Sequence, residues 1–365
     1  MNKPKILLIS GYDAASHRHW QECLASVLDG FEWTQIALPA RNFSWRVRGS
    51  ALNLYAEYSQ QLADDYDLTI ATSMVDLAAL RGLVPKVSQV PNILYFHENQ
   101  FVYPISKDQP NILNAQLSSL YSALSADEVW FNSEYNRQSF VQGARTLLKK
   151  LPDRFDGKLL EGLTARSRIL PVPLKLSPSA HIPLKTVANP PHILWNHRWE
   201  YDKQPEVFFE ALQRLKQNGT AFEVSVVGES FREIPPCFEV AKQQLSAEIL
   251  NWGYQPREKY LQILAQADLV VSSAIHDFQG LSVLEAIGQH CLPIAPNRLV
   301  YPEYIPANYL YEVGDNSCSE SEQLARHLMT HINSKDFQPI DINRFYLQDL
   351  MPKYRQRILE LISSA

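Results

Sequence analysis

The sequence has few cysteines and no long apolar run, and each shortage argues against a class of protein. Its 365 residues include four cysteines, which stand far apart and form neither a CxxC pair nor a zinc-ligand spacing. We therefore expect a reducing compartment, the cytoplasm, and no disulfide framework. The apolar run from Ile6 to Ile9 is too short for a signal peptide, and no stretch approaches the ~20 apolar residues of a membrane helix.

Several common enzyme motifs are also missing. The chain contains no GxGxxG, GxxxxGK[ST], HExxH or GxSxG sequence, which argues against a dinucleotide dehydrogenase, a P-loop enzyme and an α/β-hydrolase. Asp65-Tyr66-Asp67 has the form of a DxD metal motif, but it precedes a predicted strand, so we assign it to a solvated turn and predict no metal site. A net charge of −5 gives no general attraction to nucleic acid, which would need a local basic patch.

What is present is an alternation of apolar, strand-like runs with helical ones, typical of a doubly wound α/β fold. The predicted strands are Lys5–Ser10, Thr34–Leu38, Leu68–Ser73, Asn92–His97, Glu128–Asn132, Arg168–Pro173, His192–Asn196, Glu223–Val227, Ile249–Gly253, Leu269–Ser273 and Leu292–Ala295. The predicted helices are Trp20–Leu28, Ala51–Leu62, Leu113–Leu124, Tyr135–Leu148, Glu206–Lys216, Phe238–Leu245, Arg257–Ala267, Ser282–Gly288 and Gln348–Ile362.

A break in this rhythm divides the chain. Residues 177–191 carry four prolines and small polar residues, which is linker composition. We expect two Rossmann-like domains, residues 1–176 and 192–345, that face a cleft, where open α/β sheets bind ligands. The last segment, residues 346–365, is expected to be a helix that can cross back to the first domain.

Two cations follow the first strand of the second half. Arg198 stands directly after Asn196-His197 at the strand end, and Lys203 follows five residues later. Such a pair can neutralise a diphosphate at the mouth of a cleft. The alternative is two unrelated surface cations, because an Arg-x4-Lys spacing is common by chance.

A second cluster lies further along the same domain. A loop after a predicted strand leads from Asp277 to Gly280, and Leu281 and Ser282 open the next helix with Glu285 one turn in. Amides at a helix start bind phosphate, and a glycine allows a ligand to approach the backbone. Glu285 can accept both hydroxyls of a ribose. The alternatives are a first-turn glutamate that favours the helix dipole and an aspartate that caps the helix.

Taken together, Arg198-x4-Lys203 and Asp277-x7-Glu285 resemble the donor site of retaining GT-B glycosyltransferases of family 4. The resemblance implies a GT-B fold in which Arg198 and Lys203 hold a diphosphate, Glu285 the ribose and Asp277 the donor sugar. The family usually has Glu where this chain has Asp277. It also implies donor contacts at Gly11, after the first strand, and at the helix start of Gly280, Leu281 and Ser282, with His97 as a further catalytic residue beside Arg198, Lys203 and Asp277.

A closer resemblance covers nearly the whole chain. It rests on Pro39-Ala40-Arg41, Trp45-Arg46-x-Arg48, Leu94–Gln100, Phe131-Asn132-Ser133, His197–Lys203 and Tyr301-Pro302-Glu303, which are similar to the tRNA-queuosine alpha-mannosyltransferases. This subgroup implies transfer of mannose from GDP-mannose to queuosine in tRNA for aspartate. It implies a nucleotide-sugar donor and a tRNA as partners. From the residues themselves we expect no membrane partner, no metal and no cofactor.

Candidate acceptor contacts combine cations, aromatics and strand-end polar residues. Cations alternate with aromatic side chains near residue 45, as suits a stacked base held by phosphate contacts, although packing of Phe43 and Trp45 on the core explains the pattern equally well. Residues 135–175 hold nine Lys or Arg against three Asp or Glu, which indicates a tRNA-facing surface or a solvated helix face. The candidates are Arg41, Trp45, Arg46, Arg48, Glu98, Asn99, Gln100, Lys149 and Lys150.

Three other functions fit parts of the pattern. A family 4 enzyme with a lipid or polysaccharide acceptor would carry a basic amphipathic helix, and the predicted helix Trp20–Leu28 has too few basic residues for that. A nucleotide-sugar epimerase on a GT-B frame would release nucleotide without an acceptor. A tRNA-binding protein with an inactive donor site would not need the set of Arg198, Lys203 and Glu285. The sequence indicates no oligomeric state.

Overall fold

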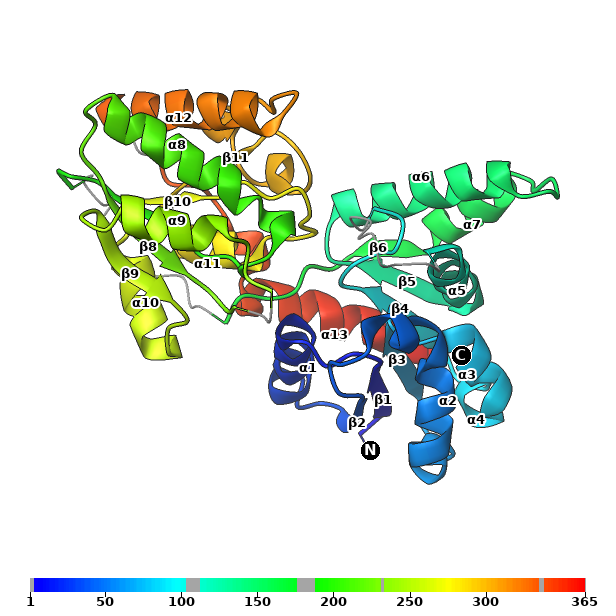
Figure 1. Ribbon diagram of the computed structural model, residues 1–365. Helices are drawn as coiled ribbons and strands as arrows, with labels where there is room; N and C mark the ends of the chain where they lie inside the picture. Colours follow the sequence, from blue (N-terminus) through cyan, green and yellow to red (C-terminus); the bar gives the residue numbers. More distant parts are fainter. Residues whose placement is uncertain (1–2, 103–111, 176–187, 231–232, 335–337, 365) are drawn as a thin grey trace. The chain divides into compact units, whose positions relative to one another are not determined.

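The chain folds into two compact units of the same kind. The structure is a computed structural model that describes residues 3–102, 112–175, 188–230, 233–334 and 338–364 (Figure 1). One unit, unit 1, contains residues 1–175 and 347–365, and the other, unit 2, contains residues 176–346. Each holds one six-stranded sheet covered by helices, which confirms the predicted α/β class. Residues 177–187 of the predicted linker lie outside the described residues.

The sheet of unit 1 is parallel throughout, with the strand order β2-β1-β3-β4-β5-β6. Its strands are β1 (Lys5–Ser10), β2 (Glu32–Ala37), β3 (Leu68–Thr72), β4 (Asn92–Phe96), β5 (Glu128–Phe131) and β6 (Ser167–Ile169). Every residue of β3, β4 and β5 is buried, because helices cover both faces of such a sheet. The strand order reverses between β1 and β3, so the ends of these strands mark the switch point of the sheet.

Eight helices belong to unit 1 among its described residues. They are α1 (Ala15–Val27), α2 (Phe43–Leu62), α3 (Leu77–Leu83), α4 (Pro85–Ser88), α5 (Ile112–Ser125), α6 (Glu134–Lys150), α7 (Lys158–Ala165) and α13 (Leu347–Ser363). The side-chain oxygen of Ser133 caps α6 by accepting the amide of Asn136 at 3.0 Å.

The C-terminal helix α13 packs within unit 1. Trp20 donates its indole N–H to the hydroxyl of Tyr354 at 3.0 Å, and Tyr354 donates in turn to the carbonyl of Leu170 at 3.0 Å. Arg357 pairs with Glu128, which is only 2% exposed, through an Nε–Oε1 hydrogen bond of 2.9 Å. These contacts bind the last helix to segments more than 150 residues away in the chain.

The sheet of unit 2 is also parallel, with the order β12-β11-β10-β7-β8-β9. Its strands are β7 (His192–Trp195), β8 (Glu223–Val227), β9 (Ile249–Gly253), β10 (Leu269–Val271), β11 (Leu292–Pro296) and β12 (Leu310–Tyr311). The helices are α8 (Pro205–Gln217), α9 (Cys237–Gln244), α10 (Arg257–Gln266), α11 (Leu281–Gly288) and α12 (Ser317–Ser334), with short 3-10 turns at Tyr201–Lys203, Tyr301–Glu303, Ala307–Tyr309 and Asn343–Phe345.

Helices α3, α4, α7 and α12 and strand β12 were not predicted, and helix α2 differs clearly from its expected bounds. Helix α2 begins at Phe43 rather than at Ala51, because Gly49 sits inside the helix and not in a preceding loop. A Cβ on Gly49 would lie 2.3 Å from the indole of Trp45, so this glycine is needed where the tryptophan ring crosses the helix. Helix α12 was not predicted at all, and it packs beside α8 (Figure 1).

Candidate active site

The sheet order of unit 2 brings two polar loops to one edge. Strands β7 and β10 are parallel neighbours, and the strand order reverses between them. The loop after β7 carries Arg198 and Lys203, and the loop after β10 carries Asp277 and Gly280. Open α/β sheets bind their ligands at the carboxyl ends of the strands at such a reversal. Residues from the two separate motifs therefore meet in one place.

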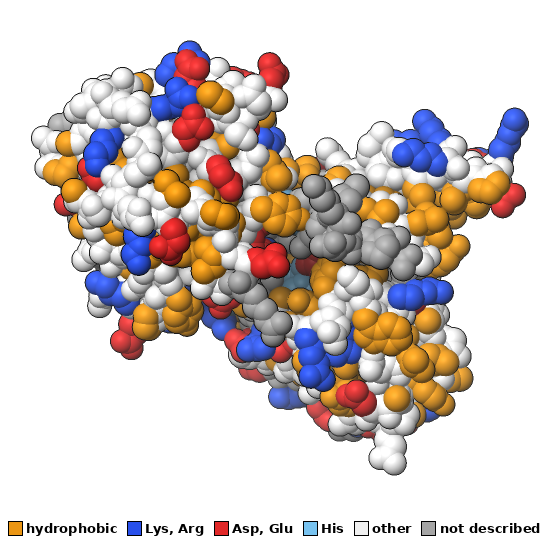
Figure 2. Space-filling model, in the orientation of Figure 1, with side chains coloured by type: hydrophobic (Ala, Val, Ile, Leu, Met, Phe, Trp, Pro, Cys, Tyr) orange, Lys and Arg blue, Asp and Glu red, His pale blue; other side chains and the backbone are white. Residues whose placement is uncertain are grey.

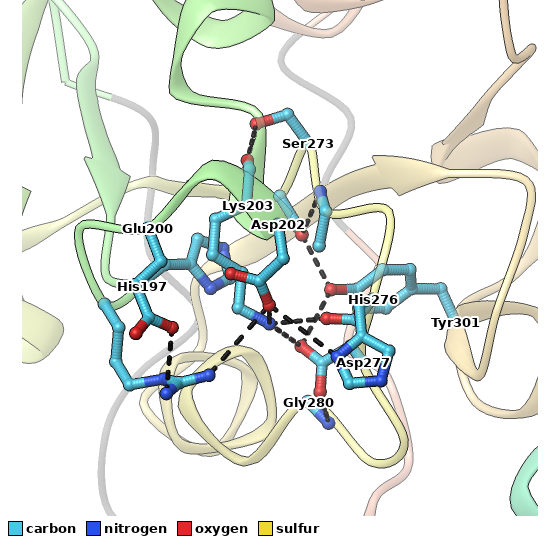
Figure 3. Close-up of polar contacts among 12 residues, drawn as sticks. His197, Glu200, Asp202, Lys203, Ser273, His276, Asp277, Gly280 and Tyr301 are labelled. Atoms are coloured by element: carbon cyan, nitrogen blue, oxygen red, sulfur yellow. Dashed lines mark hydrogen bonds and ion pairs between the residues drawn. The ribbon is translucent and has the colours of Figure 1, made fainter. Parts of the chain in front are cut away.

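Lys203 is the most buried cation of this group. Its side chain is 9% exposed, and its Nζ donates to the carbonyl oxygen of His276 at 2.6 Å. The same Nζ lies 3.4 Å from a carboxylate oxygen of Asp202 and 3.5 Å from one of Asp277 (Figure 3). This ammonium is thus one of the groups that join the loop after β7 to the loop after β10.

Arg198 lies in a more open position than Lys203. Its side chain is 47% exposed, and its guanidinium is 2.9 Å from Glu200 and 3.9 Å from Asp202. Burial raises the pKa of Glu200, an effect that Arg198 opposes and Asp202 adds to. Burial also acts to raise the pKa of Asp202. Lys203, His276 and Arg198 outweigh this effect and lower the pKa of Asp202 well below its usual value. The site therefore presents one exposed cation next to a fixed buried ion pair.

Asp277 accepts hydrogen bonds from two sides. The backbone N–H of Gly280 donates to Oδ1 at 2.9 Å, and the hydroxyl of Tyr301 donates to Oδ2 at 3.2 Å (Figure 3). Burial acts to raise the pKa of Asp277, but the charge of Lys203 and the Gly280 hydrogen bond lower it on balance. Asp277 is therefore an anion at neutral pH, and it shapes the loop before α11 as well as lying at the candidate site.

Gly280 has a left-handed conformation that favours glycine. Its φ is +69°, and a Cβ there would lie 2.6 Å from the hydroxyl of Tyr304. The space that the missing side chain leaves is thus occupied by Tyr304. Leu281 and Ser282 follow as the first residues of α11, and first-turn amides of a helix have no intrahelical acceptor and point toward a ligand position.

Glu285 contacts two residues that sequence reasoning missed. Its Oε1 accepts a hydrogen bond from Arg257 at 2.7 Å, and its Oε2 accepts one from the hydroxyl of Tyr260 at 3.1 Å. The amide of Asn196 donates to the Tyr260 oxygen at 3.0 Å and to the carbonyl of Ser282 at 2.8 Å. This network fixes the carboxylate against the end of β7 and the first turns of α10 and α11.

Gly11 stands at the end of β1, at the switch point of unit 1. A Cβ on Gly11 would lie 2.4 Å from the carbonyl oxygen of Met74, and its own N–H donates to the hydroxyl of Thr72 at 3.2 Å. Packing against the segment after β3 therefore suffices to require a glycine at this position.

His97 follows β4 and is buried among aromatic rings. Its ring stacks on that of His17 with centroids 3.9 Å apart, and it meets Tyr95 and Trp20 edge-on. Burial and the neighbouring His17 lower the pKa of His97 well below its usual value, so its ring is neutral. Its Nε2 has no hydrogen-bond partner among the described residues.

His17 connects His97 to a second candidate. The Nε2–H of His17 donates to a carboxylate oxygen of Glu98 at 3.1 Å. Glu98 therefore fixes the His17 ring, and His17 stacks on His97. The three side chains thus form one connected group. Sequence reasoning missed His17 because it stands 80 residues before His97.

Asn99 and Gln100 are buried residues, and the side-chain amide of Asn99 forms hydrogen bonds inside unit 1. Its Nδ2 donates to the side chains of Asn136 at 2.8 Å and Ser139 at 2.9 Å, and its Oδ1 accepts the amide of Phe101 at 2.9 Å. Asn99 is fully buried and Gln100 is 8% exposed. The Asn99 amide is thus engaged in shaping the turn after β4.

The aromatic and basic stretch lies on helix α2 and divides between two faces. Trp45 and Arg48 are exposed on one face, one turn apart, whereas Arg46 is 5% exposed. The indole N–H of Trp45 donates to Asn53 at 3.0 Å, and Arg48 pairs with Asp76 at 3.0 Å. Trp45 and Arg48 are therefore the members of this stretch that a partner can reach.

The remaining basic candidates are exposed. Arg41 precedes α2, and Lys149 and Lys150 end α6, all three on the surface. Figure 2 shows Lys and Arg side chains on the surface over α6 and the turn that follows it.

Two features are absent from the residues that the structure describes. No helix in that part of the chain is long and apolar enough to cross a membrane. In the same ranges, no group of three His, Cys, Asp or Glu side chains is arranged to hold a metal ion.

Comparisons with known proteins agree on the two halves of the chain. Residues 5–174 match the family model described as tRNA-queuosine alpha-mannosyltransferase N-terminal, and residues 180–338 match that of glycosyl transferases group 1. The chain is 33% identical over 368 residues to the tRNA-queuosine alpha-mannosyltransferase of Drosophila melanogaster, with 96% of each chain covered.

Solved structures share the fold at low identity. HepE of Anabaena in complex with UDP has a TM-score of 0.68 and 14% identity, covering 99% of this chain and 100% of that one. A glycosyltransferase from Rickettsia africae has a TM-score of 0.63 and 16% identity, covering all of both chains. The fold is that of the GT-B glycosyltransferases, as predicted.

Proposed function

The chain belongs to the tRNA-queuosine alpha-mannosyltransferase family, and from this we propose that it transfers mannose from GDP-mannose to queuosine in tRNA for aspartate, with retention. The observation that carries the proposal is the 33% identity to the Drosophila melanogaster enzyme across 96% of both chains. The likeness includes the N-terminal half, where residues 5–174 match the model of this same family, so it supports the acceptor as well as the donor.

In the proposed reaction the bond between C1 of mannose and the diphosphate breaks, and GDP leaves with the electron pair. A queuosine hydroxyl oxygen bonds to C1 on the same face, and its proton passes to a phosphate oxygen of the departing GDP. The main catalytic problem is the charge that develops on the departing diphosphate. Arg198 is half exposed, and the first-turn amides of α11 follow the loop after β10, so both can meet that charge.

Lys203 has a related role in this proposal. Its ammonium already contacts the two carboxylates of Asp202 and Asp277. A cation held in this way is already oriented before the reaction, so it needs no reorganisation as charge develops. Lys203 therefore stabilises the diphosphate. Asp277 accepts a hydrogen bond from a mannose hydroxyl, and Glu285 accepts hydrogen bonds from the ribose hydroxyls.

We propose that these groups act without a divalent metal or any cofactor. The support is electrostatic: Arg198 and Lys203 supply positive charge at the place where a metal would neutralise a diphosphate. Transfer should therefore proceed equally well with a chelator and with added magnesium. Loss of all turnover with the chelator would contradict this part of the proposal.

On unit 1 the proposal uses groups that are accessible or lack partners. The Nε2 of His97 is a buried polar atom without a partner among the described residues, and a sugar hydroxyl would satisfy it. The exposed indole of Trp45 offers a stacking face for a base, and Arg48, Lys149 and Lys150 are exposed cations for phosphates. We propose a tRNA contact at these residues.

The reaction class is tested by following both products at once. Purified protein is incubated with GDP-mannose, with and without tRNA that contains queuosine, and released GDP and tRNA-bound hexose are counted. The proposal expects one hexose bound for each GDP released and little GDP without tRNA. Rapid GDP release without tRNA would indicate an epimerase or a hydrolase. No hexose on tRNA, with GDP-mannose still bound, would shift the acceptor to a lipid or a polysaccharide.

A further inference from the structure

Arg257 lies against the carboxylate that is expected to hold the ribose. It is the first residue of α10, and its Nη2 donates to Oε1 of Glu285 on α11 at 2.7 Å. Its guanidinium carbon is 5.5 Å from the ring centroid of Tyr260. The carboxylate and the aromatic face together orient the guanidinium.

Most of the hydrogen-bonding capacity of Arg257 remains available. A guanidinium has five N–H donors, and the bond to Glu285 uses one of them. The other N–H groups have no protein acceptor among the described residues. The side chain is 51% exposed, so a ligand can reach them.

Glu285 can bind a ribose while it is paired with Arg257. Its two oxygens accept one hydrogen bond each, from Arg257 at 2.7 Å and from Tyr260 at 3.1 Å. A carboxylate has about four lone-pair sites, which leaves about two for the ribose hydroxyls. The nucleobase is attached directly to that ribose, so a guanidinium in contact with Glu285 lies within reach of the base.

The chemistry of the bases decides which one suits this guanidinium. Guanine presents two acceptors side by side, O6 and N7, which match the planar fork of an arginine. Adenine presents the donor N6 beside N7, and uracil has O4 but no N7. A group that only donates therefore favours guanine over both.

We propose that Arg257 binds the O6/N7 edge of guanine and is a specificity-determining residue for a GDP-linked donor. The inference rests on the proposed function, because it takes Glu285 as the ribose contact. It assigns the nucleobase, which neither the family 4 motifs nor the fold determines.

A purely structural role for Arg257 predicts a different change in nucleotide affinities. If it only neutralised Glu285 and fixed its position, its loss would weaken GDP and UDP by the same factor. If it reads the base, its loss removes the difference between nucleotides. Selectivity, rather than affinity alone, is thus the informative quantity.

The test measures dissociation constants by calorimetry for GDP, 7-deaza-GDP and UDP. The proteins are the wild type, Arg257→Met, and the matched control Arg326→Met, which removes an exposed arginine on α12 that pairs with Glu322 at 3.5 Å. In the wild type we expect GDP to bind roughly 5- to 150-fold tighter than UDP, the range of one bidentate base contact. We expect 7-deaza-GDP, which lacks the N7 acceptor, to bind about 10-fold more weakly than GDP. Both ratios should fall toward one in Arg257→Met and stay unchanged in Arg326→Met.

The outcomes separate this inference from the function on which it rests. Ratios that survive in Arg257→Met, or a wild type that does not distinguish 7-deaza-GDP from GDP, would overturn the role of Arg257 while mannose transfer from GDP-mannose continued. A wild type that neither binds GDP nor transfers mannose would overturn both. A fall of all three affinities by one common factor would leave Arg257 as a support of Glu285 and refute base reading.

Discussion

The ammonium of Lys203 lies 3.5 Å from the carboxylate of Asp277. The two residues come from different loops, one after β7 and one after β10, and the pair is one of several contacts that join these loops. The contact makes each residue a partner of the other before any donor binds. A substitution of Lys203 should therefore also affect Asp277, and a substitution of Asp277 should also affect Lys203.

Lys203 and Arg198 should differ in what their loss does to stability. Replacement of either by Met should lower kcat/KM by roughly 10- to 150-fold, the value of one charge-assisted hydrogen bond. Lys203→Met should also reduce the free energy of unfolding by about 3–5 kcal/mol, because it leaves buried carboxylates without their cation. Arg198→Met should change it by about 1 kcal/mol or less, because Arg198 is 47% exposed. Urea unfolding and initial rates measure the two quantities. If kcat/KM fell less than a few-fold in both variants, the diphosphate would have to bind elsewhere.

Asp277→Asn separates a contact to the sugar from support of the loop. An asparagine can still accept the Gly280 N–H, so the loop should persist, whereas the negative charge is lost. We expect kcat to fall at least about 10-fold and GDP affinity to change by about 3-fold or less. Asp341→Asn is a matched control, because Asp341 is an exposed aspartate that accepts the amide of Asn343 at 2.9 Å. Turnover near that of the wild type in Asp277→Asn would remove this carboxylate from the catalytic set.

His197 should make unit 2 sensitive to mild acid. Burial and the charge of Lys203 lower the pKa of His197 from 6.5 to about 4, despite opposing effects of Asp277 and Asp202. The folded state therefore binds its proton less readily than the unfolded state. The stability that results is complete above pH 6.5 and is lost as the pH falls toward 4.

Between pH 7 and pH 5 this loss should be about 2 kcal/mol. Urea unfolding at the two pH values measures it, and His197→Gln should show a pH effect smaller by that amount. His327→Gln removes a histidine on α12 whose pKa is also lowered to about 4, so by the same argument it should also reduce the pH effect, and the two reductions should add in the double variant. An unchanged pH effect in His197→Gln would mean that His197 does not titrate in this way.

Lys149 and Lys150 should contribute to the salt dependence of tRNA binding. Each phosphate contact that releases a counterion adds about 0.7–0.9 to the slope of log K against log salt. Reversal of both lysines to Glu should therefore reduce the slope by about 1.5 and weaken binding most at low salt. Reversal of Lys242 and Arg326, exposed cations of unit 2, is the control with an equal change of charge. Equal slopes for all three proteins would remove α6 from the proposed interface.

Most strands were predictable because their buried residues form short apolar runs, whereas the two-residue strand β12 was not predicted. All residues of β3, β4 and β7 are buried, and such runs stand out between helical stretches. Helix α12 was missed because its sequence is mostly polar, although Leu324, Leu328 and Ile332 lie one turn apart and form its buried stripe.

The candidate site was predictable only where residues cluster along the chain. The motifs around Arg198 and Asp277 are each local, and the parallel pairing of β7 and β10 brings them together. Arg257 stands 28 residues before the Glu285 that it contacts, and no spacing rule connects them. Conversely, Asn99 belongs to a motif that resembles the family's, but only the folded structure reveals that its amide is bound within unit 1.

The central claim is that mannose is transferred to queuosine, and one measurement tests it most directly. tRNA for aspartate is prepared from cells supplied with the queuosine base and from the same cells deprived of it, and each sample is incubated with the protein and GDP-mannose. The tRNA is then digested to nucleosides, which are separated and weighed by mass spectrometry. The account predicts one added hexose, on queuosine, in the first sample alone. Hexose on another nucleoside, equal labelling of both samples, or none in either would contradict it.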